Sequence, residues 1–374
     1  VKHVMQGSPS IRKVRGGPTK DGDSKLLPTI SPSFAVFNPQ WLAVFIADFK
    51  KAGRHFRDEL NWVDPDVLFH PTVEQVEEFL EYTGKYVTYD VETDGIDPLT
   101  CNLRCVGIGS ESKVMIVPIL SIDGQTLAYN HEEEEQIKTL LRKFFVDPHK
   151  IKVGHNAGYY DRMVIEQYLN VTPAPLVDTI LLHKLAESEA PHSLGYVGSV
   201  FTDVPAWKAE HTAVKAKTDQ ELYSYCATDV AVNAYLPGPL GRMAKRRKQL
   251  QLYHVDEKLQ EMCVGMHRIG IRIDESIRKR HEDVVSAEMV DSLSYLRENT
   301  HNKFNPNSVA QVKSLLFEDW RLTPYHFTSM GEPSTDAATL RMLIGNPALD
   351  ESQKEFIDQL RRYRKSSKLL GTYL

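Results

Sequence analysis

The sequence predicts an α/β fold with a mixed sheet, preceded by a small α/β segment and followed by an all-α region. Three observations lead to this class. Strand-length apolar segments between residues 86 and 118 are separated by a hairpin signal, which indicates antiparallel pairing. Later strand-like segments alternate with helical ones, which is typical of parallel pairing. From residue 241 onward the apolar spacing is mainly helical.

The first predicted strand begins at Tyr86 and is rich in aromatic and β-branched residues, and the turn signal Asp94-Gly95 ends it. A helix is predicted wherever apolar residues recur at three- and four-residue spacing, as they do from Trp41 to Phe49. The expected strands are 26–30, 86–91, 103–109, 113–118 and 150–153, with a turn at 31–33. The expected helices are 39–52, 71–80, 132–145, 159–169, 219–236, 249–267 and 275–300.

Composition indicates a globular protein of more than one domain. The chain has 374 residues, so two or three domains are expected, and no apolar run is long enough for a membrane span. The formal charge of −5 gives no overall nucleic-acid signal, so DNA contacts are expected at local basic patches. The four cysteines lack CxxC spacing, which disfavours zinc and fits a reducing cytoplasm. Because the chain opens at Val1, we expect a trimmed or partial product.

Two carboxylates lie on the first predicted strand. Asp90 and Glu92 are two residues apart, so both side chains point to the same face. Like charges repel at this spacing, and a divalent cation such as Mg²⁺ or Mn²⁺ would remove the conflict. The alternative is a solvated edge strand that needs no metal.

Further acidic side chains stand on predicted helices. Asp161 lies in a first helical turn, where it could simply complement the helix dipole. Tyr225 and Asp229 are one helical turn apart and project from one face. Here the alternative is a packed tyrosine beside a solvated aspartate.

Taken together, these patterns resemble the three motifs of the DEDDy 3′→5′ exonucleases over about residues 63–240. The resemblance implies a ribonuclease H-like domain that acts on single-stranded DNA 3′ ends with little sequence preference. It makes Asn156 a candidate substrate contact, with Thr93 and Leu103 lining the pocket of the terminal nucleotide. The motifs as they stand in the sequence are Asp90-x-Glu92, Asn156 to Asp161 and Tyr225-x-x-x-Asp229.

The resemblance also implies a role for each motif residue. Four carboxylates around one phosphate can hold two ions, Mg²⁺ or Mn²⁺, for phosphodiester hydrolysis. Asp90 would bridge both ions, and Glu92 and Asp229 would share one of them. Asp161 would hold the other ion through water. Tyr225 would orient the attacking water.

From residue 241 the chain resembles the start of the polymerase region of family A DNA polymerases, the DNA polymerase I type. The implied thumb grips primer–template duplex by its backbone, so Arg361 and Arg364 are expected to contact phosphates. The palm and fingers, which hold the polymerising carboxylates, would lie beyond Leu374, in another polypeptide or in a portion that has been cut off. The matching elements are Gly270-Ile-Arg-Ile-Asp274, Phe304-Asn305-Pro306, Gly331-Glu-Pro-Ser-Thr335 and the run from Tyr363 to Tyr373.

Residues 1–62 resemble the C-terminal part of a uracil-DNA glycosylase, in Leu27–Ser33, Asn38-Pro39 and the helix end Asp48–Ala52. Ser31 stands where that family has the histidine of a His-Pro-Ser loop. We therefore interpret the segment as a remnant without glycosylase activity. Such fusions are typical of phage polymerases, so a phage-like polymerase is expected.

The leading hypothesis is the proofreading exonuclease and thumb of a family A DNA polymerase, divided as 1–62, 63–240 and 241–374. One alternative is a free-standing exonuclease on DNA or RNA, which the thumb-like segment disfavours. The other is a DNA-holding scaffold for a separate polymerase chain, which the intact acidic set disfavours. The expected location is the cytoplasm of a bacterium or of a phage-infected host.

Overall fold

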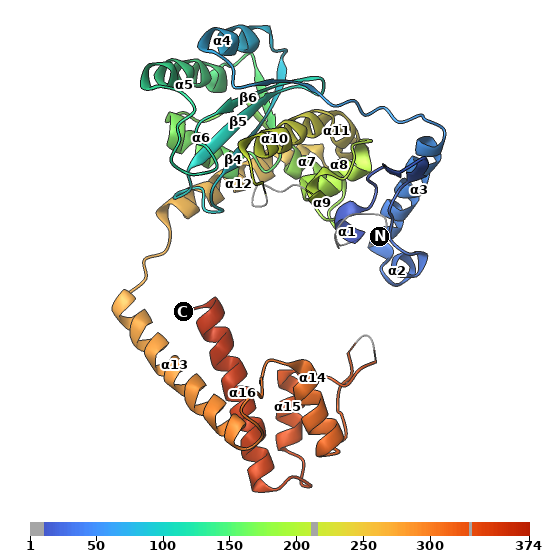
Figure 1. The fold of residues 1–374 in the computed structure, drawn as a ribbon, viewed down its shortest axis with the longest axis vertical. Coiled ribbons are helices and arrows are strands. Elements are labelled where there is room, and N and C mark those ends of the chain that lie inside the picture. Colours follow the sequence, from blue (N-terminus) through green and yellow to red (C-terminus); the bar gives the residue numbers. More distant parts are fainter. Residues whose placement is uncertain (1–10, 211–215, 329–330) are drawn as a thin grey trace. The chain divides into compact units, whose positions relative to one another are not determined.

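The computed structural model describes residues 11–210, 216–328 and 331–374. The chain divides into two compact units, of which the first ends at Gly270 and the second begins at Ile271 (Figure 1). Each unit has a hydrophobic core of its own. Within the described ranges, no helix is both long and apolar enough to cross a lipid bilayer.

The main sheet of the first unit comprises β3 Asp66–Phe69, β4 Tyr86–Thr93, β5 Leu103–Gly109, β6 Lys113–Pro118, β7 Ile151–Gly154 and β8 Leu176–Asp178. These strands lie in the order β3-β6-β5-β4-β7-β8. The pairs β4–β5 and β5–β6 are antiparallel, whereas β3–β6, β4–β7 and β7–β8 are parallel. This mixed sheet confirms the predicted α/β class.

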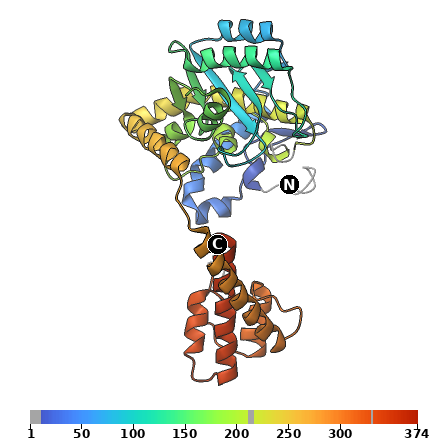
Figure 2. The same cartoon turned by 90° about the vertical axis from the view of Figure 1, so that its left-hand side faces the viewer.

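The two faces of the sheet pack against different helices. Val87, Tyr89 and Val91 of β4 share a core with α4 (Val73–Tyr82), α5 (His131–Val146) and α6 (Tyr160–Leu169), and Figure 2 shows α4 and α5 on one side of the strands. Side chains alternate along a strand, so Asp90 and Glu92 point to the other face. Helix α10 (Asp219–Ala234) packs against β4, β5 and β6 on that face.

The helices begin at polar residues that bond to free backbone N–H groups. Thr72 with Gln75 forms a capping box at the start of α4, and Asn130 with Glu133 forms one at the start of α5. Thr218 caps α10 by accepting from the backbone of Glu221. The other helices of this unit are α1 Ile11–Val14, α2 Pro32–Phe37, α3 Leu42–Phe56, α7 Thr179–Ala186, α8 Leu194–Phe201, α9 Trp207–Glu210, α11 Pro237–Arg246 and α12 Tyr253–Ile269, with 3₁₀ turns η1 Pro39–Trp41 and η3 Leu250–Leu252.

Several short elements differ from the sequence prediction. The N-terminal hairpin consists of β1 Thr19–Asp21 and β2 Ser24–Leu26, so the strand expected at 26–30 is wrong for most of its length. The turn expected at 31–33 is also wrong, because the Ser31 hydroxyl accepts the Phe34 N–H at 3.1 Å and starts α2. Strands β3 and β8 were not predicted, since each is too short to show a period and is held by a parallel neighbour.

The second unit is helical, as predicted. Helices α13 and α16 pack along each other, and side chains such as Leu296, Phe304 and Phe356 form the core. Its elements are α13 Glu275–Glu298, α14 Val309–Lys313, the π-helical turn η4 Ser314–Asp319, α15 Ala337–Ile344 and α16 Glu351–Thr372.

Candidate active site

The end of β4 presents two carboxylates beneath α10. Glu92 is buried, and Asp90 is partly buried. Burial, followed by repulsion from Asp229 and Asp161, raises the pKa of Asp90 well above its usual range. Burial and the neighbouring Asp90 have the same effect on the pKa of Glu92. Ionising both carboxyl groups here is therefore costly unless a positive charge is present.

Asp161 joins this group from the first turn of α6. Its Oδ1 accepts the backbone N–H of Val91 at 3.2 Å. The pairing of β4 with β7 ends at Thr88, so the Val91 N–H has no strand partner there, and the carboxylate replaces one. Burial and then Asp178 raise the pKa of Asp161 to about 7. This carboxylate thus binds the backbone of the strand that carries Asp90 and Glu92.

Helix α10 supplies Tyr225 and Asp229 from one face. Asp229 is 4% exposed, and it contributes to the raised pKa of both Asp90 and Glu92, so the three carboxylates are neighbours. Burial, together with Asp229, raises the pKa of the Tyr225 phenol, which is therefore protonated at neutral pH. All five acidic and tyrosine side chains named from the sequence meet at this end of β4.

Two residues of α9 complete the site, and the sequence analysis did not single them out. The Lys208 ammonium lies 2.6 Å from both the Tyr225 hydroxyl and Asp229 Oδ2. The Trp207 indole N–H donates to Asp229 Oδ1 at 2.6 Å. Burial lowers the pKa of Lys208, but Asp229 and Tyr225 outweigh it and raise that pKa above the ordinary value. No periodicity or motif distinguished Lys208 from other lysines, because its role depends on tertiary contact.

The acidic group could hold a metal ion. Ligand atoms of Asp90, Glu92 and Cys226 lie within 4.8 Å of one another. The Cys226 Sγ is 3.9 Å from Asp90 Oδ2. A hydrogen bond with Cys105, and then burial, raise the pKa of the Cys226 thiol, so it is neutral and a weak donor. The oxygen ligands favour a hard divalent cation.

The predicted substrate contacts of this unit lie around the same end of β4. Thr93 is opposite Leu103 in the β4–β5 pairing, and its hydroxyl lies 2.6 Å from the Tyr160 hydroxyl. Leu103 is buried. Asn156 has φ +65°, a conformation that asparagine tolerates better than most residues, and its N–H donates to Asp178 at 2.8 Å. Their contacts with a nucleotide remain predictions.

The arginines predicted to bind duplex DNA lie on α16 of the second unit. Arg364 donates from Nε to the Pro306 carbonyl at 2.8 Å and from Nη1 to the Thr335 carbonyl. Arg361 pairs with Asp358 at 3.2 Å. Arg364 therefore ties two loops to α16, and a phosphate contact by either arginine remains a prediction.

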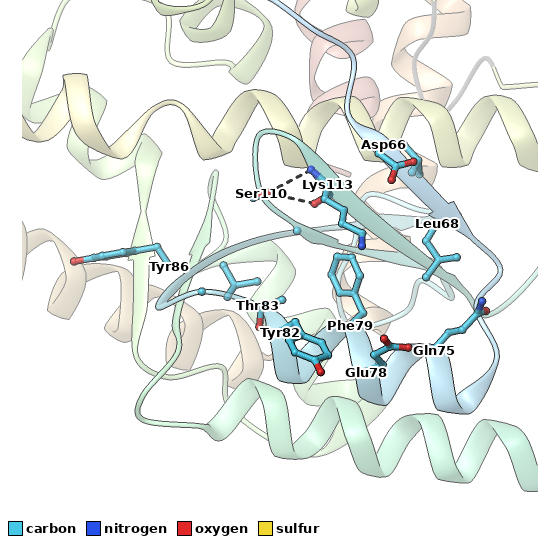
Figure 3. A pocket seen from close by; sticks show the side chains of 14 residues that line it. Asp66, Leu68, Gln75, Glu78, Phe79, Tyr82, Thr83, Tyr86, Ser110 and Lys113 are labelled. Atoms are coloured by element: carbon cyan, nitrogen blue, oxygen red, sulfur yellow. Dashed lines mark hydrogen bonds between the residues drawn. The ribbon is translucent and has the colours of Figure 1, made fainter.

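A cavity of about 460 Å³ lies away from this site, between α4 and the β3 edge of the sheet (Figure 3). Glu78 and Phe79 of α4 line it, together with Asp66 and Lys113. Leu68, which also lines it, packs into the core shared with α4, so the cavity is on the face opposite α10. Asp90, Glu92, Asp161 and Asp229 do not line this cavity and lie at the end of β4.

Comparison with known proteins agrees with the geometry. Residues 69–245 match the family model described as 3′-5′ exonuclease, of the DNA polymerase A type. DNA polymerase I of Synechocystis is 26% identical over 337 residues, covering 83% of this chain and 32% of that protein. The DNA polymerase of Escherichia phage T5 is 27% identical over 398 residues, covering 89% of this chain and 44% of that protein. The chain thus spans less than half the length of these relatives.

One solved structure extends the likeness in fold to most of the chain. It is the POL domain of Pol1 from M. smegmatis in complex with DNA primer-template and dNTP, with a TM-score of 0.52 and 15% identity. The match covers 83% of this chain and 48% of that one. The mixed sheet, the cluster of acidic side chains and the family match lead to one conclusion: residues 69–245 form a 3′-5′ exonuclease domain of the kind found in DNA polymerase I.

Proposed function

We propose that this exonuclease domain proofreads for a family A DNA polymerase and acts on the 3′ end of single-stranded DNA. The observation that carries the proposal is the meeting of Asp90, Glu92, Asp161, Asp229 and Tyr225 at one end of β4. These residues come from a strand and two helices, so their convergence is a property of the fold and not of one local motif.

The residues fit a pair of divalent cations. Among the described residues, the Asp90 side chain has only the Cys226 thiol within hydrogen-bond reach, at 3.9 Å, so its oxygens are left with one weak donor. We infer that Asp90, Glu92, Asp161 and Asp229 would together hold two divalent ions, Mg²⁺ or Mn²⁺, at the end of β4. When bound, such ions supply positive charge to the attacking and leaving oxygens of the phosphodiester.

The protein side chains would position the water and the cations' ligands. The Tyr225 hydroxyl is a donor and an acceptor, so it can orient a water molecule toward the phosphorus. Lys208 holds that hydroxyl, and Trp207 holds the Asp229 carboxylate in one rotamer. Thr93, Leu103 and Asn156 would contact the terminal nucleotide.

The rest of the chain fits a larger polymerase. We propose that residues 241–374 begin the thumb and bind primer–template duplex, with Arg361 among the phosphate contacts. Palm and fingers would come from a further portion or a separate chain. We further propose a phage-like polymerase, working in a bacterial or phage-infected cytoplasm, in which residues 1–62 are a glycosylase-like remnant. The phage T5 relative supports this source.

Digestion of a 5′-labelled single strand tests the proposal. The chain should shorten the strand from its 3′ end with Mg²⁺ or Mn²⁺, and EDTA should stop the reaction. Asp90→Asn should reduce the rate by more than about 100-fold, because it removes a carboxylate charge that would hold the cations. Glu111→Gln, an exposed carboxylate in the β5–β6 turn, should leave the rate unchanged. Equal rates for wild type and Asp90→Asn would refute the site.

A further inference from the structure

The N-terminal segment grips the stretch of chain that leads into Lys208. The gripping residues, called here the brace, are Arg15–Gly17, Thr29 and three residues of α3, namely Asp48, Lys51 and Arg54. The gripped stretch runs from Ser199, at the end of α8, to Ala206, immediately before α9. Figure 1 shows α1 and α3 beside α8 and α9 within the first unit.

A buried lysine of the brace fixes the end of α8. Lys51 is 3% exposed, and its ammonium donates to the carbonyls of Gly16 at 2.9 Å and Thr202 at 2.6 Å, and to that of Ser199. A buried charge without fixed partners is costly, so these carbonyls are held in place. Burial lowers the pKa of Lys51 to about 8.

An arginine–aspartate pair adds a second hold. Arg15 bonds Asp48 through Nε at 2.8 Å, and both side chains are 1% exposed. The Arg15 Nη1 donates to the Ser199 hydroxyl at 2.9 Å, and the Thr29 hydroxyl donates to Asp48 at 2.7 Å. Separating these partners would leave a buried charge unpaired, which is costly. The contacts between Arg15, Asp48 and Ser199 are therefore expected to persist.

Asp203 makes the third set of contacts with the brace, and of these polar contacts it lies nearest to α9 in the sequence. It forms an ion pair with Arg54 of α3, and its Oδ2 accepts the Asn61 N–H at 3.1 Å. Its side chain is 8% exposed. Only Val204, Pro205 and Ala206 separate Asp203 from Trp207, so the position of Asp203 limits where α9 can lie.

The fourth contact is a close approach that only glycine permits. A Cβ placed on Gly17 would lie 2.5 Å from the Ala206 Cβ and 2.8 Å from the Ala206 backbone nitrogen. On the far side, the Trp207 ring and the Lys208 stem rest against α8: Cβ atoms added to Gly198 and Gly195 would meet them at 2.9 and 3.1 Å. The loop is therefore held between the brace and α8.

We propose that the brace sets the position of Trp207 and Lys208 over Asp229 and Tyr225, so that Gly17, Arg54 and Asp203 are positioning residues for the exonuclease. The inference rests on the proposed roles of Lys208 and Asp229. None of the three residues reaches the reacting atoms. They act through the short link to α9, whose two side chains bond the catalytic carboxylate and phenol.

Gly17→Ala tests this in the full chain. The added methyl should push the Ala206 backbone, shift α9 and lower the digestion rate by about 10- to 100-fold. Gly53→Ala is the matched control, because its Cβ would meet nothing closer than the tip of Arg57 at 3.5 Å. Arg54→Ala should give a smaller loss that Arg54→Lys restores. Wild-type rates in both Gly17→Ala and Arg54→Ala would overturn the proposal.

A double-mutant cycle separates positioning from general damage. If the brace acts through α9, Gly17→Ala should cost little further rate in a Lys208→Ala background, whereas independent losses multiply. Multiplying losses would overturn the proposal.

Calorimetric Mn²⁺ titration gives a readout that does not depend on turnover. Gly17→Ala should displace the Lys208 ammonium from Asp229, and Lys208→Ala removes it. Both variants should therefore lower the dissociation constant for Mn²⁺ by about 3- to 10-fold, because a competing positive charge is lost. If the wild type digests no DNA, the proposed function fails, and this titration still decides the positioning role. If the dissociation constant for Mn²⁺ is lowered in Lys208→Ala but unchanged in Gly17→Ala, the positioning role of the brace is refuted.

Discussion

The Lys208 ammonium lies 2.6 Å from the Asp229 carboxylate, which is itself almost fully buried. The pair neutralises one of the four carboxylates that meet at the end of β4. A cation bound to the same carboxylates would compete with the ammonium. The negative charge of Asp229 can therefore be compensated either by Lys208 or by a bound cation.

Lys208→Met should therefore lower the free energy of unfolding more in the metal-free protein than in the protein with bound Mn²⁺. Breaking the pair leaves Asp229 buried and uncompensated, and the free energy of unfolding in EDTA should fall by about 2 kcal/mol. Mn²⁺ should recover part of the loss. Urea unfolding in EDTA and in Mn²⁺ measures both values, with the exposed Lys143→Met on α5 as the control. An equal loss of unfolding free energy in EDTA and in Mn²⁺ would argue against the idea that Lys208 and the cation compensate the same carboxylate.

Tyr225→Phe should slow digestion less than Asp229→Ala. The first change removes one hydroxyl that orients water, whereas the second removes a buried charge that a cation needs. Single-turnover digestion at saturating Mg²⁺ compares the two variants. A slower Tyr225→Phe would mean that the phenol does more than orient water.

The contribution of Asp161 to the stability of the metal-free protein should fall as pH rises from about 4 to about 7. Burial and Asp178 raise the folded-state pKa of Asp161 from 3.8 to about 7, so its contribution is fully present below about pH 4 and lost toward pH 7. Buried His155 and His183, whose pKa burial lowers to about 4, act in the opposite direction below pH 6.5. The informative quantity is thus the difference in Tm between wild type and Asp161→Asn.

In EDTA, the Tm of the wild type should fall relative to that of Asp161→Asn as the pH is raised from 5 to 8. In Mn²⁺, the difference in Tm between the two proteins should change less with pH. The asparagine keeps an oxygen for the Val91 N–H, so the variant tests charge and not the hydrogen bond. Parallel melting curves across this range would contradict the raised pKa of Asp161.

The chain alone should bind primer–template duplex but not extend the primer. Exposed Lys365 and Lys368 of α16 offer phosphate contacts, and replacing each by alanine should reduce the salt slope of binding by about 1. Extension should require a palm and fingers portion added in trans. Extension by the purified chain without it would show that the C-terminal interpretation is wrong.

Much of this fold was predictable because its signals are local. The central strand was evident from Tyr86 to Val91 through β-branched and aromatic residues, and the capping residues of α4, α5 and α10 are visible in the sequence. β3 and β8 were not predictable, since three or four residues show no period and their order depends on a parallel neighbour.

The same distinction applies to the site. Asp90, Glu92, Tyr225 and Asp229 lie at spacings that a strand and a helix convert directly into shared faces. Lys208 offers no such spacing, because its partners lie 17 and 21 residues away along the chain. Packing alone brings α9 to α10, and the brace that sets it comes from still farther away.

The bond from the Val91 N–H to the Asp161 carboxylate has a consequence for folding as well as chemistry. β7 ends before it can pair with this part of β4, so an acidic side chain occupies the place of a neighbouring strand. The Asp161 carboxylate therefore belongs both to the hydrogen bonding of β4 and to the cation site proposed above. Amide exchange at Val91 should then become slower when ions occupy the proposed site, because fixing the Asp161 carboxylate also fixes the acceptor of this N–H.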